Sequence, residues 1–219
     1  MMKVLELFAG TRSIGKAFGS KGHEVFSIDW DKSFGNIDWY IDISKVKVKD
    51  ILERFGRPDV IWASPDCTTF SVAAISHHRR KDPVTGYLYP VSEYARYCDE
   101  VDQHMLGLIN GLRPALWFIE NPRGGMRKMP WMEKLPRYTV TYCQYGDIRM
   151  KPTDIWTNHP RPCFLPICKN GDPCHEAAPR GSRTGTQGLD GSIERSRIPV
   201  RFCEHIVDIC EEHMISDAY

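Results

Sequence analysis

The feature that most constrains the fold is a series of short apolar runs, each ending at a turn residue or a polar side chain. Their length suits buried strands and is too short for most helices. The runs occupy residues 4–8, 24–28, 40–43, 60–63 and 115–119. Between the runs, apolar residues recur with helical periodicity, most clearly over 48–55 and 92–112. Strands that alternate with helices predict an α/β fold, with a parallel sheet covered by helices on both faces.

The composition is that of an ordinary globular protein and excludes several classes. With 219 residues, the chain can form one full domain with a sizeable core. No apolar run approaches the roughly 20 residues of a membrane span, and the first residues lack the pattern of a signal peptide. A net charge of +1 means that any surface for nucleic acid must be local. Without an export signal, we expect a cytoplasmic protein whose 8 cysteines are thiols.

The first two runs end in residues typical of a site for a nucleotide-like ligand. Gly10 permits a tight turn after the first run, and Ser13 is a candidate N-cap for the helix that follows. Asp29 comes 19 residues after Gly10, close to the interval at which an acidic side chain binds a ribose. Trp30 offers a flat face against which an adenine could stack. The full dinucleotide fingerprint is absent, so a plain turn is the alternative.

Two reactive side chains follow later strands at the same edge of the sheet. Cys67 comes just after the run 60–63, which should stop before Pro65 because proline cannot donate to a sheet ladder. Glu120 follows the run 115–119, where an ionised carboxylate is costly, so we expect its pKa to be raised. A cysteine nucleophile beside a protonated glutamate predicts acid-assisted covalent catalysis. The alternative is a half-buried loop cysteine without a role.

Three motifs at these strand ends point to a known family. They are Phe-Ala-Gly at 8–10, Ser-Pro-Asp-Cys at 64–67 and Glu-Asn-Pro at 120–122. In this order they resemble the motifs of the S-adenosylmethionine-dependent DNA cytosine-5 methyltransferases, most closely the small phage and bacterial members. The resemblance covers residues 3–158, with a weaker echo at 197–210. It implies a Rossmann-like methyltransferase sheet and a recognition insert, which in the family is usually much longer than the short, irregular segment found here.

The resemblance also implies a reaction, a cofactor and a role for each matching residue. The target would be cytosine in double-stranded DNA, flipped out of the duplex to reach the pocket. Cys67 would attack carbon 6, and Glu120 would hold ring nitrogen 3 and donate a proton. Arg149 or Lys151 would take the role of the family's cytosine-contacting arginine, in a register that the sequence leaves open. S-adenosylmethionine would donate the methyl group. Its implied binding residues are Phe8, Gly10, Thr11, Ser13, Asp29 (at the ribose), Trp30, Asp42 (at the adenine amino group), Ser64 and Pro65.

The chain departs from the family pattern close to both reactive residues. Asp66 and Thr68 flank Cys67 where the family usually has proline and glutamine, and Pro122 replaces a valine. The family's Gln-x-Arg-x-Arg segment is poorly matched over 145–153. These departures bear on the transferred group and on the base that is modified, and not on the scaffold.

Residues 71–90 are expected to form a long loop that closes over DNA. Arg79, Arg80 and Lys81 make a basic cluster that could reach phosphates beside the cysteine. A solvated surface loop is the alternative. The apolar stripe of the following helix, 92–112, is expected to pack in the core. Its members are Tyr94, Tyr97, Val101, Met105, Leu108 and Leu112.

Residues 159–196 are expected to form the target-recognition insert, between a catalytic domain (1–158) and a C-terminal helix (197–219) that completes it. The segment is rich in Pro, Gly, Arg and Cys and is too short to build a core of its own. The candidate DNA contacts are Arg180 and Arg183, with Arg161 and Lys169 nearby. The irregular cysteine spacing favours no metal, with a zinc clamp as the alternative. Its ligands would be Cys163, Cys168, Cys174 and His175.

Two other functions stay open at this point. A relative that had lost catalysis could bind DNA without modifying it, although the intact pair of Cys67 and Glu120 argues against this. An enzyme of the same fold could instead act on RNA or on a free nucleotide, which the short insert permits. In each case we expect a monomer.

Overall fold

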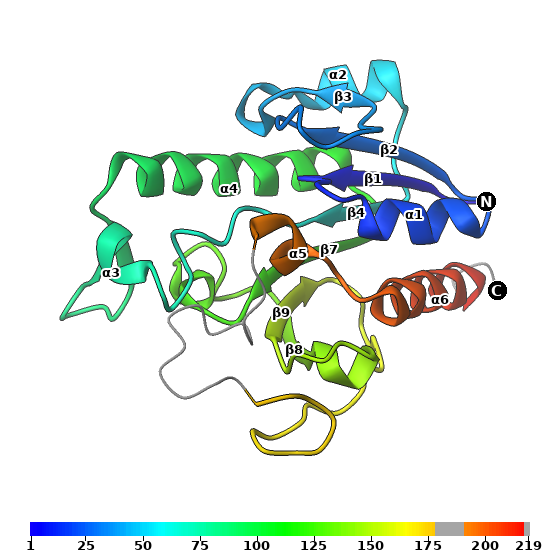
Figure 1. The fold of residues 1–219 in the computed structure, drawn as a ribbon. Coiled ribbons are helices and arrows are strands. Elements are labelled where there is room, and N and C mark those ends of the chain that lie inside the picture. The colour runs from blue at the N-terminus through cyan, green and yellow to red at the C-terminus, as the bar shows by residue number, and fades with distance from the viewer. Residues whose placement is uncertain (178–190, 217–219) are drawn as a thin grey trace.

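The centre of the molecule is one seven-stranded sheet (Figure 1). The computed structural model describes residues 1–177 and 191–216. The strands, in their order across the sheet, are β3 (Trp39–Tyr40), β2 (Glu24–Asp29), β1 (Lys3–Leu7), β4 (Val60–Ala63), β7 (Leu116–Pro122), β9 (Pro152–Thr157) and β8 (Arg137–Thr141). The first five run parallel, whereas β9 is antiparallel to both of its neighbours.

Each predicted apolar run contributes to a strand of this sheet, but one of the strands is much shorter than expected. The run 40–43 contributes only its first residue to β3, because the pairing with β2 ends at Tyr40. The Asp42 carboxylate accepts a hydrogen bond from the N–H of Ser44 and so caps the 3₁₀ helix η1 (Ile43–Lys45). In contrast, β7 runs past the apolar segment to Pro122, since it pairs with β9 over that length. The carboxylate of Glu120 therefore stands on a strand and not in a loop.

The strand order reverses beside β1, and this reversal positions the site. From β1 the chain moves to β2 on one side and later returns to β4 on the other. The connections that leave β1 and β4 therefore diverge, which opens a crevice at their carboxyl ends.

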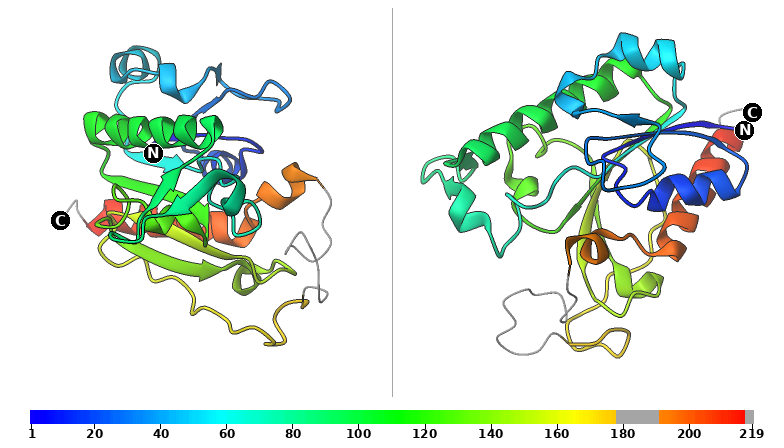
Figure 2. Two further views of the ribbon diagram at one scale, coloured as in Figure 1. Left: turned by 90° about the vertical axis from the view of Figure 1, so that its left-hand side faces the viewer. Right: turned by 45° about the horizontal axis from the view of Figure 1, so that its top comes forward.

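Helices cover both faces of the sheet, as predicted. The helix α4 (Glu93–Leu112) crosses one face, and α1 (Ser13–Ser20) and α6 (Val200–Ser216) lie side by side on the other (Figures 1 and 2). The shorter helices are α2 (Val48–Arg54), α3 (Ile75–His78), α5 (Ser192–Ser196), η2 (Gly125–Lys128) and η3 (Tyr142–Tyr145). Among the described residues, none of the helices has the length and apolar character needed to cross a membrane.

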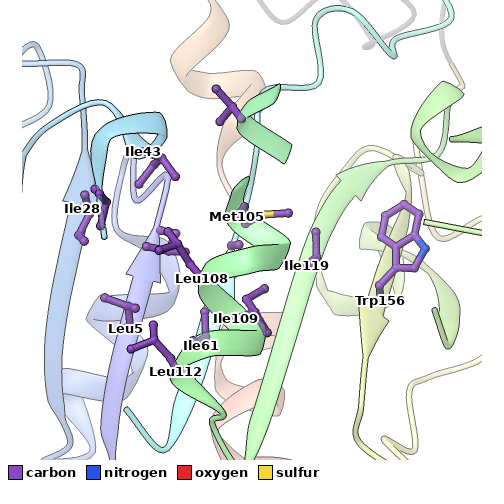
Figure 3. Packing of buried hydrophobic residues seen from close by; sticks show 14 of the residues in the cluster. Leu5, Ile28, Ile43, Ile61, Met105, Leu108, Ile109, Leu112, Ile119 and Trp156 are labelled. Carbon is purple, nitrogen blue, oxygen red and sulfur yellow. The ribbon is translucent and has the colours of Figure 1, made fainter. Parts of the chain in front are cut away.

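The core consists of two apolar layers, one on each face of the sheet. Successive strand residues point to opposite faces, so Leu5 and Ile61 pack against Leu108 of α4 (Figure 3). The neighbouring position Val4 points the other way, into the layer that contains Phe202 of α6. These side chains are at most 2% exposed. Burial of each one stabilises the fold by about 1.5–3 kcal/mol.

Residues 71–90 contain regular structure where a long loop was expected. After the single turn α3, strands β5 (Arg79–Lys81) and β6 (Leu88–Pro90) form a small antiparallel hairpin. Residues 159–177, in contrast, contain no helix or strand. In both figures this yellow segment lies beyond β8, at the opposite side of the molecule from α2 (Figures 1 and 2).

Candidate active site

A cavity of about 480 Å³ opens at the carboxyl ends of β1, β4 and β7. The predicted ligand-binding residues and the predicted reactive residues both line this cavity, because the turn after β1 and the loop after β4 border the same crevice. The predicted residues that line it are Phe8, Gly10, Thr11, Ser13, Asp29, Trp30, Ser64, Pro65, Cys67, Glu120 and Lys151. Asp42 and Arg149, which were predicted with them, lie outside this lining.

The turn after β1 is held in place by the end of β2. Gly10, Phe8 and Arg12 all have left-handed backbone conformations, with φ of 48°, 56° and 56°. Glycine adopts this conformation without strain, whereas the other two residues need support from their surroundings. The Asp29 carboxylate accepts hydrogen bonds from the N–H groups of Gly10 and Asp31, each at 2.8 Å. The N–H of Gly10 is therefore engaged by Asp29.

Ser13 is the first residue of α1 and not its N-cap, so that prediction was wrong. The N-cap position belongs to Arg12, which has no side-chain capping bond. The hydroxyls of Ser13 and Thr11 lie 2.9 Å apart and form a hydrogen bond to each other. Both residues still line the cavity, as expected for a ligand site.

Glu6 is a site residue that sequence reasoning missed. It lies in β1, is 2% exposed and lines the cavity. Its Oε1 accepts a hydrogen bond from the N–H of Gly15 at 3.0 Å, while its buried Oε2 has no hydrogen-bond partner in the described part of the chain. Burial raises the pKa of Glu6 from 4.5 to about 7, and the Gly15 N–H and Arg12 offset part of this shift. A carboxylate inside the apolar run 4–8 was the signal that could have revealed it.

Two aromatic side chains flank the turn. Trp30 is 67% exposed and lines the cavity, so its ring is available to a ligand. Phe34, which the sequence did not single out, lies above the turn. A methyl group added at Gly10 would come within 3.8 Å of the Phe34 ring. A planar ligand group would thus meet aromatic faces here.

Tyr94 and Tyr97 were predicted to pack in the core, and this was wrong. They are 42% and 41% exposed, with ring centroids 6.4 Å apart. The hydroxyl of Tyr94 donates to Asp66, and that of Tyr97 donates to Asp42 at 2.6 Å. A tyrosine in an apolar stripe can expose its polar end, which periodicity alone does not distinguish. Both tyrosines therefore orient acidic side chains at the sheet edge.

Asn121 links the two strand ends that carry the reactive residues. Its Nδ2 donates to the carbonyl oxygen of Pro65 at 3.0 Å, which joins β7 to the loop after β4. The Cys67 carbonyl accepts from the N–H groups of Phe70 and Ser71 at 3.0 and 2.9 Å, so a helical turn begins at the cysteine. These bonds fix the backbone on both sides of a partly exposed thiol.

The Cys67 thiol is held in its protonated form. Burial raises its pKa to about 11, and the carboxylates of Asp66 and Glu120 add to the shift, while the Lys151 ammonium group opposes it. From its place just after a strand end, we expected a helix start or a basic group to lower the pKa of the Cys67 thiol, and this expectation was wrong. Asp66, one of the departures from the family pattern, is among the causes.

The raised pKa predicted for Glu120 is confirmed. The side chain is 6% exposed, and desolvation by burial raises its pKa. The Lys151 charge and a hydrogen bond from the Tyr142 hydroxyl to Oε1, at 3.0 Å, oppose the shift. Glu120 can therefore carry a proton where an exposed glutamate would have lost it. Tyr142 had no signal in the sequence, because it contacts Glu120 across the sheet.

The structure separates the two candidates for the cytosine-contacting cation. Lys151 lines the cavity, and its Nζ donates to the carbonyl oxygen of Arg195 in α5 at 2.7 Å. Burial lowers the pKa of Lys151, and the nearby Glu120 carboxylate opposes this. Arg149 is buried in an ion pair with Asp147, with Nε and Oδ1 2.9 Å apart. Its guanidinium group is thus directed to Asp147 and away from the lining of the cavity.

Arg79 does not present its charge to solvent, so its prediction as a DNA contact was wrong. It is 2% exposed, its Nη2 lies 2.7 Å from Asp99 Oδ1, and its Nε donates to the Thr69 carbonyl at 3.0 Å. Alternate residues of a strand point to opposite sides, so Arg79 of β5 points inward and Arg80 outward. Arg80 and Lys81 are exposed and stay predicted DNA contacts.

The structure describes only part of residues 159–196, the predicted recognition insert. Arg180 and Arg183 lie outside the described residues. Arg161 and Lys169 are exposed. The predicted zinc ligands are not all together, because Cys163 is exposed and lies outside the cluster that the other three form. Cys143 of η3 joins that cluster in its place.

Comparison with known proteins tests the resemblance seen in the motifs. No protein-family model matches the chain. A protein of Frog virus 3 (isolate Goorha), named a probable DNA (cytosine-5)-methyltransferase, is 28% identical over 95% of this chain and the whole of the viral protein. The resemblance to the DNA cytosine-5 methyltransferases is confirmed. The match extends through the segment 159–196, where the motifs alone gave no support.

Solved structures show the same fold. A protein assigned as a DNA modification methyltransferase, from a prophage in E. coli, superposes with a TM-score of 0.53 and 15% identity. S. pombe Dnmt2 methyltransferase superposes with a TM-score of 0.51 and 14% identity. Each match covers 72% of this chain but only 46% and 49% of the solved chains, so this chain spans about half their length. The predicted Rossmann-like methyltransferase sheet is thereby confirmed.

Proposed function

We propose that this protein transfers a methyl group from S-adenosylmethionine to carbon 5 of cytosine in DNA, through a covalent bond to Cys67. The observation that carries the proposal is the single cavity that Cys67 and Glu120 share with the turn after β1. The name of the viral relative, which is matched over its whole length, supports the same reaction.

The reacting groups fit the electronic demands of this chemistry. Cytosine carbon 5 becomes a good nucleophile only after addition at carbon 6. The Cys67 sulfur, once deprotonated, would bond to carbon 6, and Glu120 would protonate ring nitrogen 3 as the ring gains the electron pair. After carbon 5 has taken the methyl group, it would lose its proton to a base. The carbon–sulfur bond then breaks, and nitrogen 3 returns its proton to Glu120.

The residues of the turn fit the methyl donor. S-adenosylmethionine supplies an electrophilic methyl group on a sulfonium centre. Its charged amine needs an acidic partner, and Glu6 lines the cavity with one carboxylate oxygen, Oε2, that has no hydrogen-bond partner in the described part of the chain. Trp30 and Phe34 would flank the adenine, and Asp29 would bind the ribose. Asp42 lies outside the cavity lining, which argues against the contact with the adenine amino group that was first expected.

Lys151 is the cation that we assign to the base. Its ammonium group opposes the raised pKa of Cys67, so it favours the thiolate that must attack. Arg149, held by Asp147, would act indirectly by fixing the segment that leads to Lys151.

DNA would approach the open side of the cavity with its target base flipped out of the duplex. The exposed Arg80 and Lys81, together with Arg180 and Arg183, would bind backbone phosphates. The division into a catalytic part (1–158), a recognition insert (159–196) and a completing helix (197–219) stays a prediction. The same holds for the monomeric state and the cytoplasmic location.

The test is incubation with radiolabelled S-adenosylmethionine and DNA, followed by digestion to nucleosides. We expect label in 5-methylcytosine, its loss in Cys67→Ser, and its retention in Cys163→Ser, which alters an exposed cysteine away from the cavity. Parallel reactions contain RNA and cytidine nucleotides. Label in one of these alone would reassign the substrate. DNA binding by the folded protein without label in any substrate would favour the relative that had lost catalysis.

A further inference from the structure

A second group of reactive side chains lies outside the cavity, where the segment 159–177 meets η3. It consists of three thiols and one imidazole, which come from three separate parts of the chain. Its members are Cys143, Cys168, Cys174 and His175. The four candidate ligand atoms all lie within 4.8 Å of one another. Cys143 and Cys168 are buried, while Cys174 is exposed.

The distances within the group match those around a tetrahedral zinc ion. Zn–S bonds of about 2.3 Å and Zn–N bonds of about 2.05 Å imply an S···S distance of roughly 3.8 Å and an S···N distance of roughly 3.6 Å. The Nδ1 atom of His175 lies 3.7 Å from Cys168 Sγ and 3.6 Å from Cys174 Sγ. The Cys174 and Cys143 sulfurs are 3.6 Å apart. The contact between Cys143 and Cys168, at 3.1 Å, would have to open on binding, while the two remaining pairs of ligand atoms lie within 4.8 Å of each other.

The surrounding chain directs these ligands to one point. The N–H of Cys168 donates to Thr141 Oγ1 at 3.0 Å, which fixes this residue against the end of β8. The N–H of Glu176 donates to the Ile148 carbonyl at 2.8 Å and holds the backbone just after His175. The side chains thus converge through backbone contacts on both sides of the group.

We propose that Cys143, Cys168, Cys174 and His175 form a structural zinc site that fastens the recognition insert to the catalytic sheet. Three thiolates and one neutral imidazole complete a four-coordinate shell, which is typical of structural and not catalytic zinc. Binding would release the thiol protons to solvent. The bound Nδ1 leaves the imidazole proton on Nε2.

The site would order a segment that has little other support. Residues 159–177 contain neither helix nor strand, so few backbone bonds hold them. A metal that joins η3 to both 168 and 174–175 closes two loops at once. The chain then enters 178–190, which carries Arg180 and Arg183, from a fixed point. Zinc would therefore act on DNA recognition by position, without contact to the cavity.

Metal content and cobalt substitution test the site on the full-length protein, purified with reductant and supplied with zinc. We expect one zinc per chain by elemental analysis after desalting. The cobalt form should show the visible absorption of tetrahedral cobalt and a thiolate-to-cobalt charge-transfer band. Cys174→Ser should lose both signals and Cys163→Ser should keep both, since both cysteines are exposed in the same segment. This pair avoids a buried substitution that could prevent folding.

Limited trypsin digestion gives a second readout that does not depend on activity. Lys169 lies between the ligands in sequence. In the wild type, removal of the metal by a chelator should accelerate cleavage after Lys169. In Cys174→Ser, the chelator should leave the cleavage rate unchanged. The proposal is overturned if the wild type retains no more zinc than Cys174→Ser, or if Cys163→Ser loses as much. A metal-free protein with a disulfide between Cys143 and Cys168 would also overturn it.

Discussion

Glu6 makes the stability of the protein depend on pH in a way that one substitution can isolate. Its carboxyl is buried in β1, where Oε1 accepts from the Gly15 N–H at 3.0 Å and Oε2 lies 4.0 Å from Arg12 Nε. Burial outweighs both contacts and raises the pKa from 4.5 to about 7. Glu6→Gln keeps the carbonyl oxygen for Gly15 and removes the ionisation.

The sign and size of the pH effect on stability follow from how many protons Glu6 binds in the folded and the unfolded state. The folded state has the higher pKa, so between pH 4.5 and about 7 it holds a proton that the unfolded chain has lost. The contribution of Glu6 to stability is therefore complete below pH 4.5 and is lost as the pH rises through 7. Each pKa unit corresponds to about 1.4 kcal/mol, so the loss amounts to about 3 kcal/mol.

Urea unfolding of wild type and Glu6→Gln, at about pH 5 and about pH 8, measures this loss. Near pH 5 the two should be similarly stable, because protonated glutamate and glutamine are alike. Near pH 8 the variant should be more stable by about 3 kcal/mol. Glu53→Gln, at a site 62% exposed, is the control and should follow the wild type. Parallel pH profiles for wild type and Glu6→Gln would refute the reasoning.

Two other predictions concern the reactive cysteine and the hairpin. Cys67 should be alkylated slowly near neutral pH, with a rate that rises up to about pH 11. Asp66→Asn should shift this pH profile to lower pH because it removes a negative charge beside the thiol. An unshifted profile would contradict the role of Asp66 in raising the pKa of Cys67. Arg79→Ala should reduce stability by about 3 kcal/mol or more, since it leaves a buried carboxylate unpaired. Combined Arg80→Ala and Lys81→Ala should instead leave stability nearly unchanged and flatten the salt dependence of DNA affinity. Equal stability losses in the two variants, by urea titration, would contradict the placement of Arg79.

The sheet could be predicted from the sequence because a short local pattern marks each of its central strands. Runs such as 60–63 and 115–119 are apolar on both faces and end at residues that cannot continue a strand or are costly to bury. The same logic placed Cys67 and Glu120 at one edge. The antiparallel direction of β9 could not be predicted from the sequence. It depends on pairing with β7 and β8, which no local pattern encodes.

The errors have a common physical origin, which is that side-chain direction depends on tertiary contacts. Arg79 and Arg80 are adjacent in sequence, yet only the first finds a buried acidic partner, in α4. Tyr97 follows the apolar stripe of its helix, but its hydroxyl reaches Asp42, 55 positions away. Cys143 lies 25 positions before Cys168 and outside the cysteine-rich insert. Residues 159–196 taken alone therefore grouped Cys163 with the other candidates and missed Cys143, which the structure places in the cluster.

The central claim is that Cys67 bonds covalently to the target base, and trapping with DNA that contains 5-fluorocytosine tests it most directly. Fluorine cannot leave carbon 5 as a cation, so the methylated adduct should persist through denaturation and be located at Cys67 by mass spectrometry. Cys67→Ser should give no adduct, and Cys98→Ser, which alters a buried helical cysteine, should give as much as the wild type. A wild-type protein that methylates ordinary DNA but forms no adduct, or forms it at another cysteine, would contradict the role assigned to Cys67.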